Sequence, residues 1–177
     1  MTFWHGRPPA VAARLLPGHW EGDRIKGTFN RSAVGTRVER SSRWVLLARL
    51  ENASAPAARD GFSRVLNGVP AAMRKTLTDD PGQAMSEQAR LTAMTGVAVF
   101  FADPHRPWQR GRHENTNGLL REYRPKGTEL SGYTQDDLNA MAWKLNHRPR
   151  KLHGFRTPRQ VYNDLLTLAQ RPDSTIH

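Results

Sequence analysis

The chain has 177 residues, enough for one domain with a hydrophobic core. Its 27 Lys and Arg outnumber 16 Asp and Glu, which gives a net charge of +11 and a pI near 11.1. Such a balance favours a polyanionic partner, most often nucleic acid, although an arginine-rich composition can also reflect a GC-rich genome. The absence of cysteine excludes disulfides and thiolate chemistry, and no apolar run approaches the roughly 18 residues of a membrane span. We therefore expect no membrane partner.

The first 50 residues predict an arm and then three strands. Residues 1–16 are proline-rich, have no hydrophobic period and predict an N-terminal arm. Strands are expected at 19–27, at 33–40, where Val34, Thr36 and Val38 alternate, and at 43–50. The continuous apolar stretch of 43–50 is typical of a central strand that is covered on both faces.

A helix is expected next, over residues 58–69. Phe62, Val65 and Leu66 fall on one face of this helix, and Gly68 marks its end. The preceding stretch, "ENASAP", is expected to be a loop.

Two more strands are expected, at 75–80 and 97–104, with a helix at 84–96 between them. Gly96 ends that helix, and its inward residues are expected to be Met85, Ala89 and Thr92.

Three further helices are expected at 114–123, 131–149 and 157–170, followed by a disordered tail at 171–177. Their cap signals are Thr134 with Asp137, and Thr157 with Pro158.

Three consecutive strands followed by alternating helices and strands predict a meander joined to parallel strands. The fold class expected for residues 17–170 is α/β: a ribonuclease-H-like, mixed five-stranded sheet flanked by helices, with extra C-terminal helices.

Three of the 16 acidic residues occupy unusual positions. Asp23 lies within the first strand, Asp80 lies where a short strand runs into Pro-Gly, and Glu114 begins a helix. Carboxylates are the ligands that Mg²⁺ prefers, and two such ions can clamp the oxygens of a phosphoryl transfer. Each acid alone has a simpler explanation, because an Asp at a strand end is more often a turn former.

Several long, collinear segments resemble transposases of the insertion sequence 30 family. The segments include "PGHWEGDRIKG", "SAVGTRVERSSRWVLL", "MRKTLTDDPGQAM", "TGVAVFFADPHRPWQRG", "ENTNGLLREYRPKGTELSGYTQDDL" and "LNHRPRK". The catalytic domain of that family is an integrase-like DDE core. The resemblance implies that Asp23, Asp80 and Glu114 are the three catalytic acids and hold two Mg²⁺ or Mn²⁺ ions. Between the last two acids lie 114 − 80 − 1 = 33 residues, which is the family's spacing.

Basic, amide and aromatic residues around Glu114 are candidates for DNA binding. They are His105, Trp108, Gln109, Arg110, Arg112, Asn115, Asn117, Arg121 and Lys126, with Arg148 and Arg150 further along the chain. Trp108 could instead anchor the core or a loop, His105 could be structural, and the segment 146–151 could be a solvated basic loop.

The chain departs from the family pattern at Asp79, Pro81, Ala84, Arg106 and His113. The family commonly has an aromatic residue where Asp79 stands. Neighbouring residues of a strand point to opposite faces, so only one of Asp79 and Asp80 can serve the site. The family's N-terminal helix-turn-helix region is expected to be missing, which leaves the activity of this copy open.

The expected function is metal-dependent DNA cleavage and strand transfer by a DDE transposase. The expected partners are the element ends, the target DNA and further copies of the chain, at the nucleoid in a bacterial cytoplasm. Two alternatives remain: an inactive DNA-binding remnant, and a ribonuclease-H-like nuclease that cuts hybrids or junctions without joining them. A purely structural basic protein would not need carboxylates at these three places.

Overall fold

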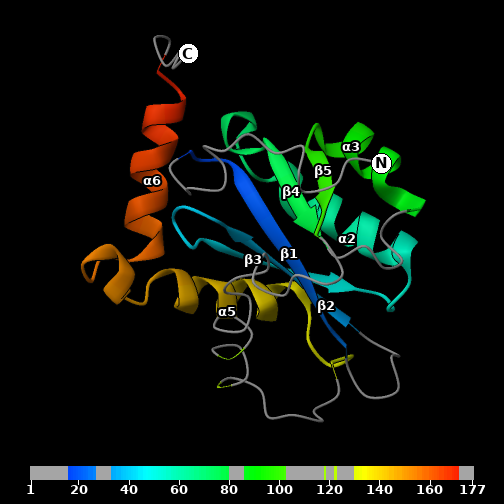
Figure 1. Cartoon of the computed structure of the whole chain (residues 1–177). Helices are drawn as coiled ribbons and strands as arrows, with labels where there is room; N and C mark the ends of the chain where they lie inside the picture. The colour runs from blue at the N-terminus through cyan, green and yellow to red at the C-terminus, as the bar shows by residue number, and fades with distance from the viewer. Residues whose placement is uncertain are drawn as a thin grey trace.

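A computed structural model describes residues 16–26, 33–79, 86–102, 118, 122 and 130–171 (Figure 1). Its strands are β1 (His19–Lys26), β2 (Ala33–Glu39), β3 (Val45–Leu50), β4 (Thr76–Asp79) and β5 (Ala98–Phe101). Its α-helices are α2 (Ala55–Asn67), α3 (Gln88–Thr95), α5 (Gln135–Asn146) and α6 (Pro158–Ala169), with 3₁₀ turns η3 (Ala71–Met73) and η6 (Lys151–His153). All five expected strands are confirmed, while the helix expected at 114–123 and the tail at 171–177 lie almost entirely outside the described residues.

The five strands form one mixed sheet in the order β3-β2-β1-β4-β5. β1 pairs with β2, and β2 with β3, in antiparallel fashion, which confirms the expected meander. β4 pairs with β1 and with β5 in parallel, as the later alternation of helices and strands predicted. The expected fold class is therefore confirmed, and β1 lies at the centre of the sheet.

The prediction that β3 is a central strand is wrong, because β3 is an edge strand. Both of its faces are nevertheless covered, which explains its continuous apolar sequence. Amide side chains of α5 also cover its free edge. Asn146 accepts from the Val45 N–H at 2.8 Å and donates to the Val45 carbonyl at 2.9 Å. Gln135 bonds the Arg49 N–H and the Leu47 carbonyl in the same way.

Helices cover the sheet on two sides and create two hydrophobic cores (Figure 1). The first core joins α2, α3 and α6 to one face of the sheet and contains Trp20, Phe62, Leu66, Leu77 and Phe101, among others. The second joins α5 to the other face and contains Val34, Val38, Leu47, Leu138 and Leu145, among others. We call these two surfaces of the sheet the α2 face and the α5 face.

Side-chain caps set two helix starts as the sequence indicated. Thr134 and Thr157 each form a capping box, with Asp137 and Gln160 respectively. The helix expected to start at residue 58 begins at Ala55 instead, because Ser54 caps it and accepts from the Ala57 N–H at 3.3 Å. The stretch expected to be a loop thus contributes the first turn of α2.

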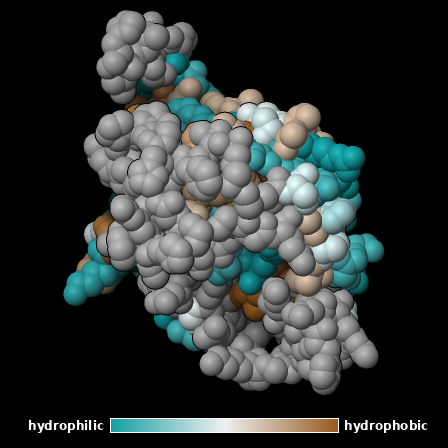
Figure 2. Space-filling model, turned by 45° about the vertical axis from the view of Figure 1, so that its right-hand side comes forward, coloured by the Kyte–Doolittle hydropathy of each residue, from teal (hydrophilic) through white to brown (hydrophobic). Residues whose placement is uncertain are grey.

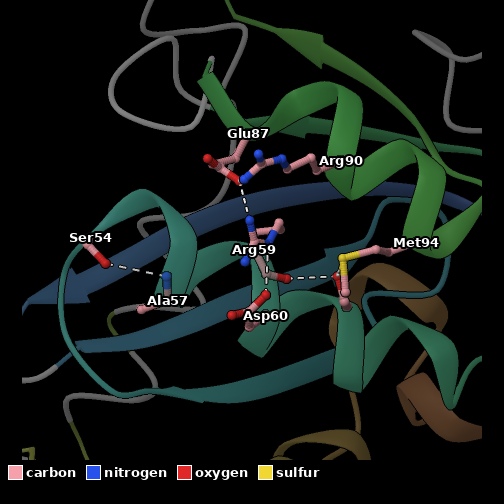
Figure 3. A network of polar contacts seen from close by, with 8 residues as sticks. Ser54, Ala57, Arg59, Asp60, Glu87, Arg90 and Met94 are labelled. Atoms are coloured by element: carbon pink, nitrogen blue, oxygen red, sulfur yellow. Dashed lines mark hydrogen bonds and ion pairs between the residues drawn. The ribbon is translucent and has the colours of Figure 1, made fainter.

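The inward face of α3 differs from the expected one. Ala89 is exposed and Thr92 half-buried, whereas Leu91 and Thr95 are buried; Met85 lies outside the described residues. Polar contacts with α2 set this orientation (Figure 3). The Arg59 guanidinium donates both to its neighbour Asp60 and to Glu87 at the start of α3, and the Ser63 hydroxyl contacts the Met94 sulfur at 3.7 Å.

Figure 2 shows the molecular surface from one side. On the described residues in this view, most side chains are hydrophilic, with small hydrophobic areas between them. Within the ranges that the structure describes, no helix is both long and apolar enough to cross a bilayer.

Candidate active site

Asp23 is the one predicted catalytic acid that lies within the described residues, and it projects from the α5 face of β1. Its neighbour at i+2, Ile25, packs against the α5 core, whereas Trp20 belongs to the α2 core. Because strand residues alternate between faces, Asp23 shares the face of Ile25. Asp23 is only partly buried, and its Oδ1 accepts from the Arg24 N–H at 2.7 Å. The carboxylate is therefore oriented and accessible.

Two buried hydroxyls share this face with Asp23. Thr36 pairs with Asp23 in the β1–β2 register, and Thr78 pairs with Glu21 in the β1–β4 register. Among the described residues, neither Thr36 Oγ1 nor Thr78 Oγ1 has a hydrogen-bond partner, although both side chains are buried. Buried hydroxyls are normally satisfied, so these two oxygens are an exception in the sheet beside Asp23.

Glu21 lies two residues before Asp23, on the same face. It is almost fully buried, and its Oε1 lies 3.0 Å from Nη1 of the equally buried Arg40. The ion pair holds Glu21 inside the protein, so Asp23 is the more exposed of the two acids of β1. Sequence analysis missed the pair, because nothing in the spacing of residues 21 and 40 indicates that they meet.

The α2 face carries a second buried ion pair directly behind Asp23. Arg37 Nη2 donates to Asp79 Oδ2 at 2.9 Å, and the Arg37 side chain has no exposed surface. The pKa of Arg37 is lowered by burial and partly restored by the Asp79 carboxylate. The structure thus places Asp79, the acid that departs from the family pattern, on the face opposite Asp23, in agreement with the prediction that at most one of Asp79 and Asp80 serves the site.

Most of the other predicted site residues fall outside the described ranges. These are Asp80 and Glu114, with His105, Trp108, Gln109, Arg110, Arg112, Asn115, Asn117, Arg121 and Lys126. Pro81, Ala84, Arg106 and His113, which depart from the family pattern, also lie there. Their roles stay predictions.

Arg148 and Arg150 are described, and both already have partners. Arg148 donates to Glu122 at 2.9 Å and is about half exposed. Arg150 is half-buried and donates to the Leu145 carbonyl at the end of α5, at 3.3 Å. Arg148 keeps exposed donor groups for a phosphate, whereas Arg150 is in part structural, so the two predicted contacts differ in character.

The chemistry of the described donors fits a hard cation such as Mg²⁺. Asp23 provides a partly exposed carboxylate, the ligand type that Mg²⁺ prefers, and the buried Thr36 and Thr78 hydroxyls lie on the same face. Within the described ranges, no group of three His, Cys, Asp or Glu residues could hold an ion alone. A complete site would need carboxylates from other parts of the chain.

Comparison with known proteins identifies relatives over most of the chain. It is 56% identical, over 94% of its length, to the transposase for insertion sequence element IS1086 of Cupriavidus metallidurans. It is 42% identical, over 89%, to the transposase InsI for insertion sequence element IS30A of Escherichia coli. The chain is a homologue of insertion sequence 30 transposases. It spans about half the length of these relatives, 49% and 41% respectively, and no family model matches it.

Solved structures confirm the fold of this transposase homologue. The catalytic core domain of BIV integrase superposes with a TM-score of 0.66 at 17% identity, covering 87% of this chain and 99% of that domain. A chain of the simian T-cell lymphotropic virus intasome, solved in complex with PP2A regulatory subunit B56 gamma, gives a TM-score of 0.62 at 19% identity. That match covers 84% of this chain and 55% of the other. The mixed sheet of the transposase homologue is thus the ribonuclease-H-like sheet of integrase catalytic cores.

Proposed function

We propose that this chain is the catalytic core of a DDE transposase, which cleaves the ends of an insertion sequence and joins them to target DNA. The observation that carries the proposal is its 56% identity, over 94% of the chain, to a named transposase. The integrase-like fold and the accessible Asp23 on the central strand support it. The names of the relatives favour this function over a hybrid or junction nuclease.

We further propose that Asp23, Asp80 and Glu114 hold two Mg²⁺ or Mn²⁺ ions. Support comes from the parallel pairing of β1 with β4, which aligns Glu21 with Thr78. Two more residues of the same pairing would align Asp23 with Asp80 on the α5 face. Bound ions would polarise the scissile phosphate and lower the pKa of the attacking water.

The chain's own residues then orient the site and the DNA. The Arg24 N–H donates to Asp23 Oδ1 at 2.7 Å and so orients the carboxylate that would act as a ligand. In the first step, the oxygen of a water molecule bonds to phosphorus and the 3′ oxygen leaves, which frees a 3′-hydroxyl. In the second, that 3′ oxygen bonds to a target phosphorus and displaces the target's own 3′ oxygen. Arg148 and the basic residues around Glu114 would bind the phosphates.

Partners and location follow from the same proposal. The substrates would be element ends and target DNA, bound by several copies of the chain at the nucleoid of a bacterial cytoplasm. The net charge of +11 supports a polyanionic partner.

The test is a nicking and joining assay with supercoiled plasmid, a pre-cut terminal-repeat duplex and Mg²⁺ or Mn²⁺. The variants are Asp23→Asn and Glu114→Gln, and the matched controls are Asp136→Asn and Glu51→Gln, which alter exposed carboxylates away from the site. We expect the site variants to lose product by about 100-fold or more, because each would remove a metal ligand, while the controls keep the parental rate. A folded parent that binds DNA but forms no product would support the inactive remnant instead. Cutting of RNA–DNA hybrids or junctions without joining would support the nuclease.

A further inference from the structure

The α2 face of the central sheet contains a buried cluster built around Arg37. Besides its 2.9 Å bond to Asp79, the Arg37 guanidinium lies 3.3 Å above the centroid of the Phe62 ring and donates to the Thr36 carbonyl at 3.3 Å. One side chain thus links β2, β4 and α2. None of this cluster belongs to the proposed metal site, yet it lies directly behind it.

Two glycines create the space that this cluster occupies. A Cβ atom on Gly22 of β1 would lie 1.7 Å from Arg37 Nη1, and a Cβ atom on Gly35 of β2 would lie 2.0 Å from the Phe62 ring. Both distances are far below van der Waals contact, so no other residue fits without displacing Arg37 or Phe62. Strands β1 and β2 therefore both contain glycine where the Arg37 cluster requires it.

Stability alone does not explain a charged pair at this place. Burial lowers the pKa of Arg37, and within the described residues its Nε has no hydrogen-bond partner. A buried ion pair with such incomplete satisfaction usually contributes no more stability than well-packed apolar residues of similar size. What the pair adds is a fixed direction for the Asp79 side chain, because a charge-assisted bond has one preferred geometry.

We propose that the Arg37–Asp79 pair is a positioning device that directs the following acid, Asp80, toward Asp23. The inference rests on the proposed function, since it needs Asp80 to be a metal ligand. Because neighbouring residues of a strand point to opposite faces, holding the Asp79 side chain on the α2 face would turn the following residue to the α5 face, where Asp23 lies. The pair also neutralises a carboxylate that would otherwise stand beside the metal-binding acids.

Three variants separate positioning from mere packing. Asp79→Asn keeps the shape and a hydrogen-bond acceptor for Arg37 but removes the charge. Arg37→Met removes the guanidinium that donates to the buried Asp79 carboxylate. The double variant Arg37→Met with Asp79→Phe replaces the ion pair by apolar packing. Asp164→Asn is the matched control, because it removes the carboxylate of an exposed ion pair, with Arg156, far along the chain.

The readout is Mn²⁺ binding to the whole chain, followed by electron paramagnetic resonance without DNA and without turnover. Thermal unfolding in the absence of metal is measured in parallel. We expect Asp79→Asn and Arg37→Met to weaken Mn²⁺ binding by roughly 10- to 100-fold, as the loss of groups that orient metal ligands does. The double variant should recover most of the parental affinity, and Asp164→Asn should match the parent. If Arg37→Met does not fold, Mn²⁺ binding by Asp79→Asn tests the proposal by itself.

Parental Mn²⁺ affinity in folded Asp79→Asn would overturn the inference and leave the proposed function intact. A double variant that melts like the parent but binds Mn²⁺ as poorly as Asp79→Asn would also overturn it, because apolar anchoring would then fail to position the acid. Parental binding that is insensitive to both Asp23→Asn and Glu114→Gln would instead reject the proposed function, and the positioning role with it.

Discussion

At the centre of the sheet, the α2 face and the α5 face each contain an aspartate carboxylate, but the two carboxylates have different environments. On the α2 face, the Asp79 carboxylate meets the Arg37 guanidinium at 2.9 Å, and both are buried. On the α5 face, the Asp23 carboxylate is partly exposed, and the buried hydroxyls of Thr36 and Thr78 have no hydrogen-bond partner among the described residues. A buried carboxylate bonded to a buried guanidinium holds the fold together, whereas a partly exposed one can be reached by a ligand. The difference in exposure agrees with the proposal that Asp23, and not Asp79, is an acid of the site.

The largest effect is expected when the Arg37 guanidinium is removed from the α2 face. Arg37→Met should lower the free energy of unfolding by about 3–5 kcal/mol, because it removes the guanidinium that pairs with the buried Asp79 carboxylate. Chemical denaturation followed by circular dichroism measures the change. The double variant with Asp79→Phe should recover most of the loss; a single variant as stable as the parent would show that the pair is not structural.

The space behind Asp23 can be tested by adding one methyl group. Gly22→Ala should destabilise the fold by about 1–3 kcal/mol, because its Cβ would collide with the buried Arg37 guanidinium. Gly132→Ala is the matched control, since no atom of the described residues lies within 4 Å of a Cβ atom at that position. Equal midpoints for the two variants in denaturant titrations would argue against a tightly packed cluster.

The edge of β3 offers a third test, at a distance from both faces. Asn146→Ala should cost about 1–3 kcal/mol, since the N–H and the carbonyl of Val45 lose their partner. An uncovered edge should also promote self-association, which sedimentation velocity measures. Asn146→Asp keeps the acceptor and loses the donor, so its free energy of unfolding should lie between those of Asn146→Ala and the parent. A monomeric and fully stable Asn146→Ala would show that the amide cap is dispensable.

Loss of the Asp23 charge on the α5 face should leave stability almost unchanged. We expect Asp23→Asn to shift the free energy of unfolding by less than about 0.5 kcal/mol, because the side chain is partly exposed. The same variant should abolish metal-dependent nicking. Differential scanning calorimetry beside the nicking assay checks both, and a large loss of stability would place Asp23 among the structural acids instead.

The smallest expected effect is a pH dependence from His153. Its Nε2 donates to the Ser42 carbonyl at 2.9 Å, and burial lowers its pKa below 6.5. With a depressed folded-state pKa, the stabilising contribution of His153 is complete above pH 6.5 and is lost as the pH falls through the folded-state pKa. Thermal midpoints between pH 8 and pH 5 should therefore fall slightly more steeply for the parent than for His153→Gln. If the two curves of thermal midpoint against pH are parallel, His153 does not contribute to the loss of stability at low pH.

Much of the fold was predictable because its signals are local. The caps at Thr134 and Thr157 and the left-handed glycine at Gly96 each depend on a few neighbouring residues, and the structure confirms them. The order of five strands also followed from local patterns. The site was predictable only in part: Asp23 was named from resemblance, and its accessible position agrees, while Asp80 and Glu114 stay predictions.

The sequence by itself determined the order of elements, the helix caps and the alternation that separates Asp79 from Asp80. These properties depend on neighbours along the chain. Only the tertiary structure decided that β3 lies at an edge, that Leu91 and not Ala89 faces the core, and that Arg37 is buried against Asp79. Alternation in β2 marked Val34, Thr36 and Val38 as one face, yet it could not reveal that the other face is buried as well. Arg37 and Asp79 are 42 residues apart, and such pairing depends on strand order and helix placement, which no local pattern encodes.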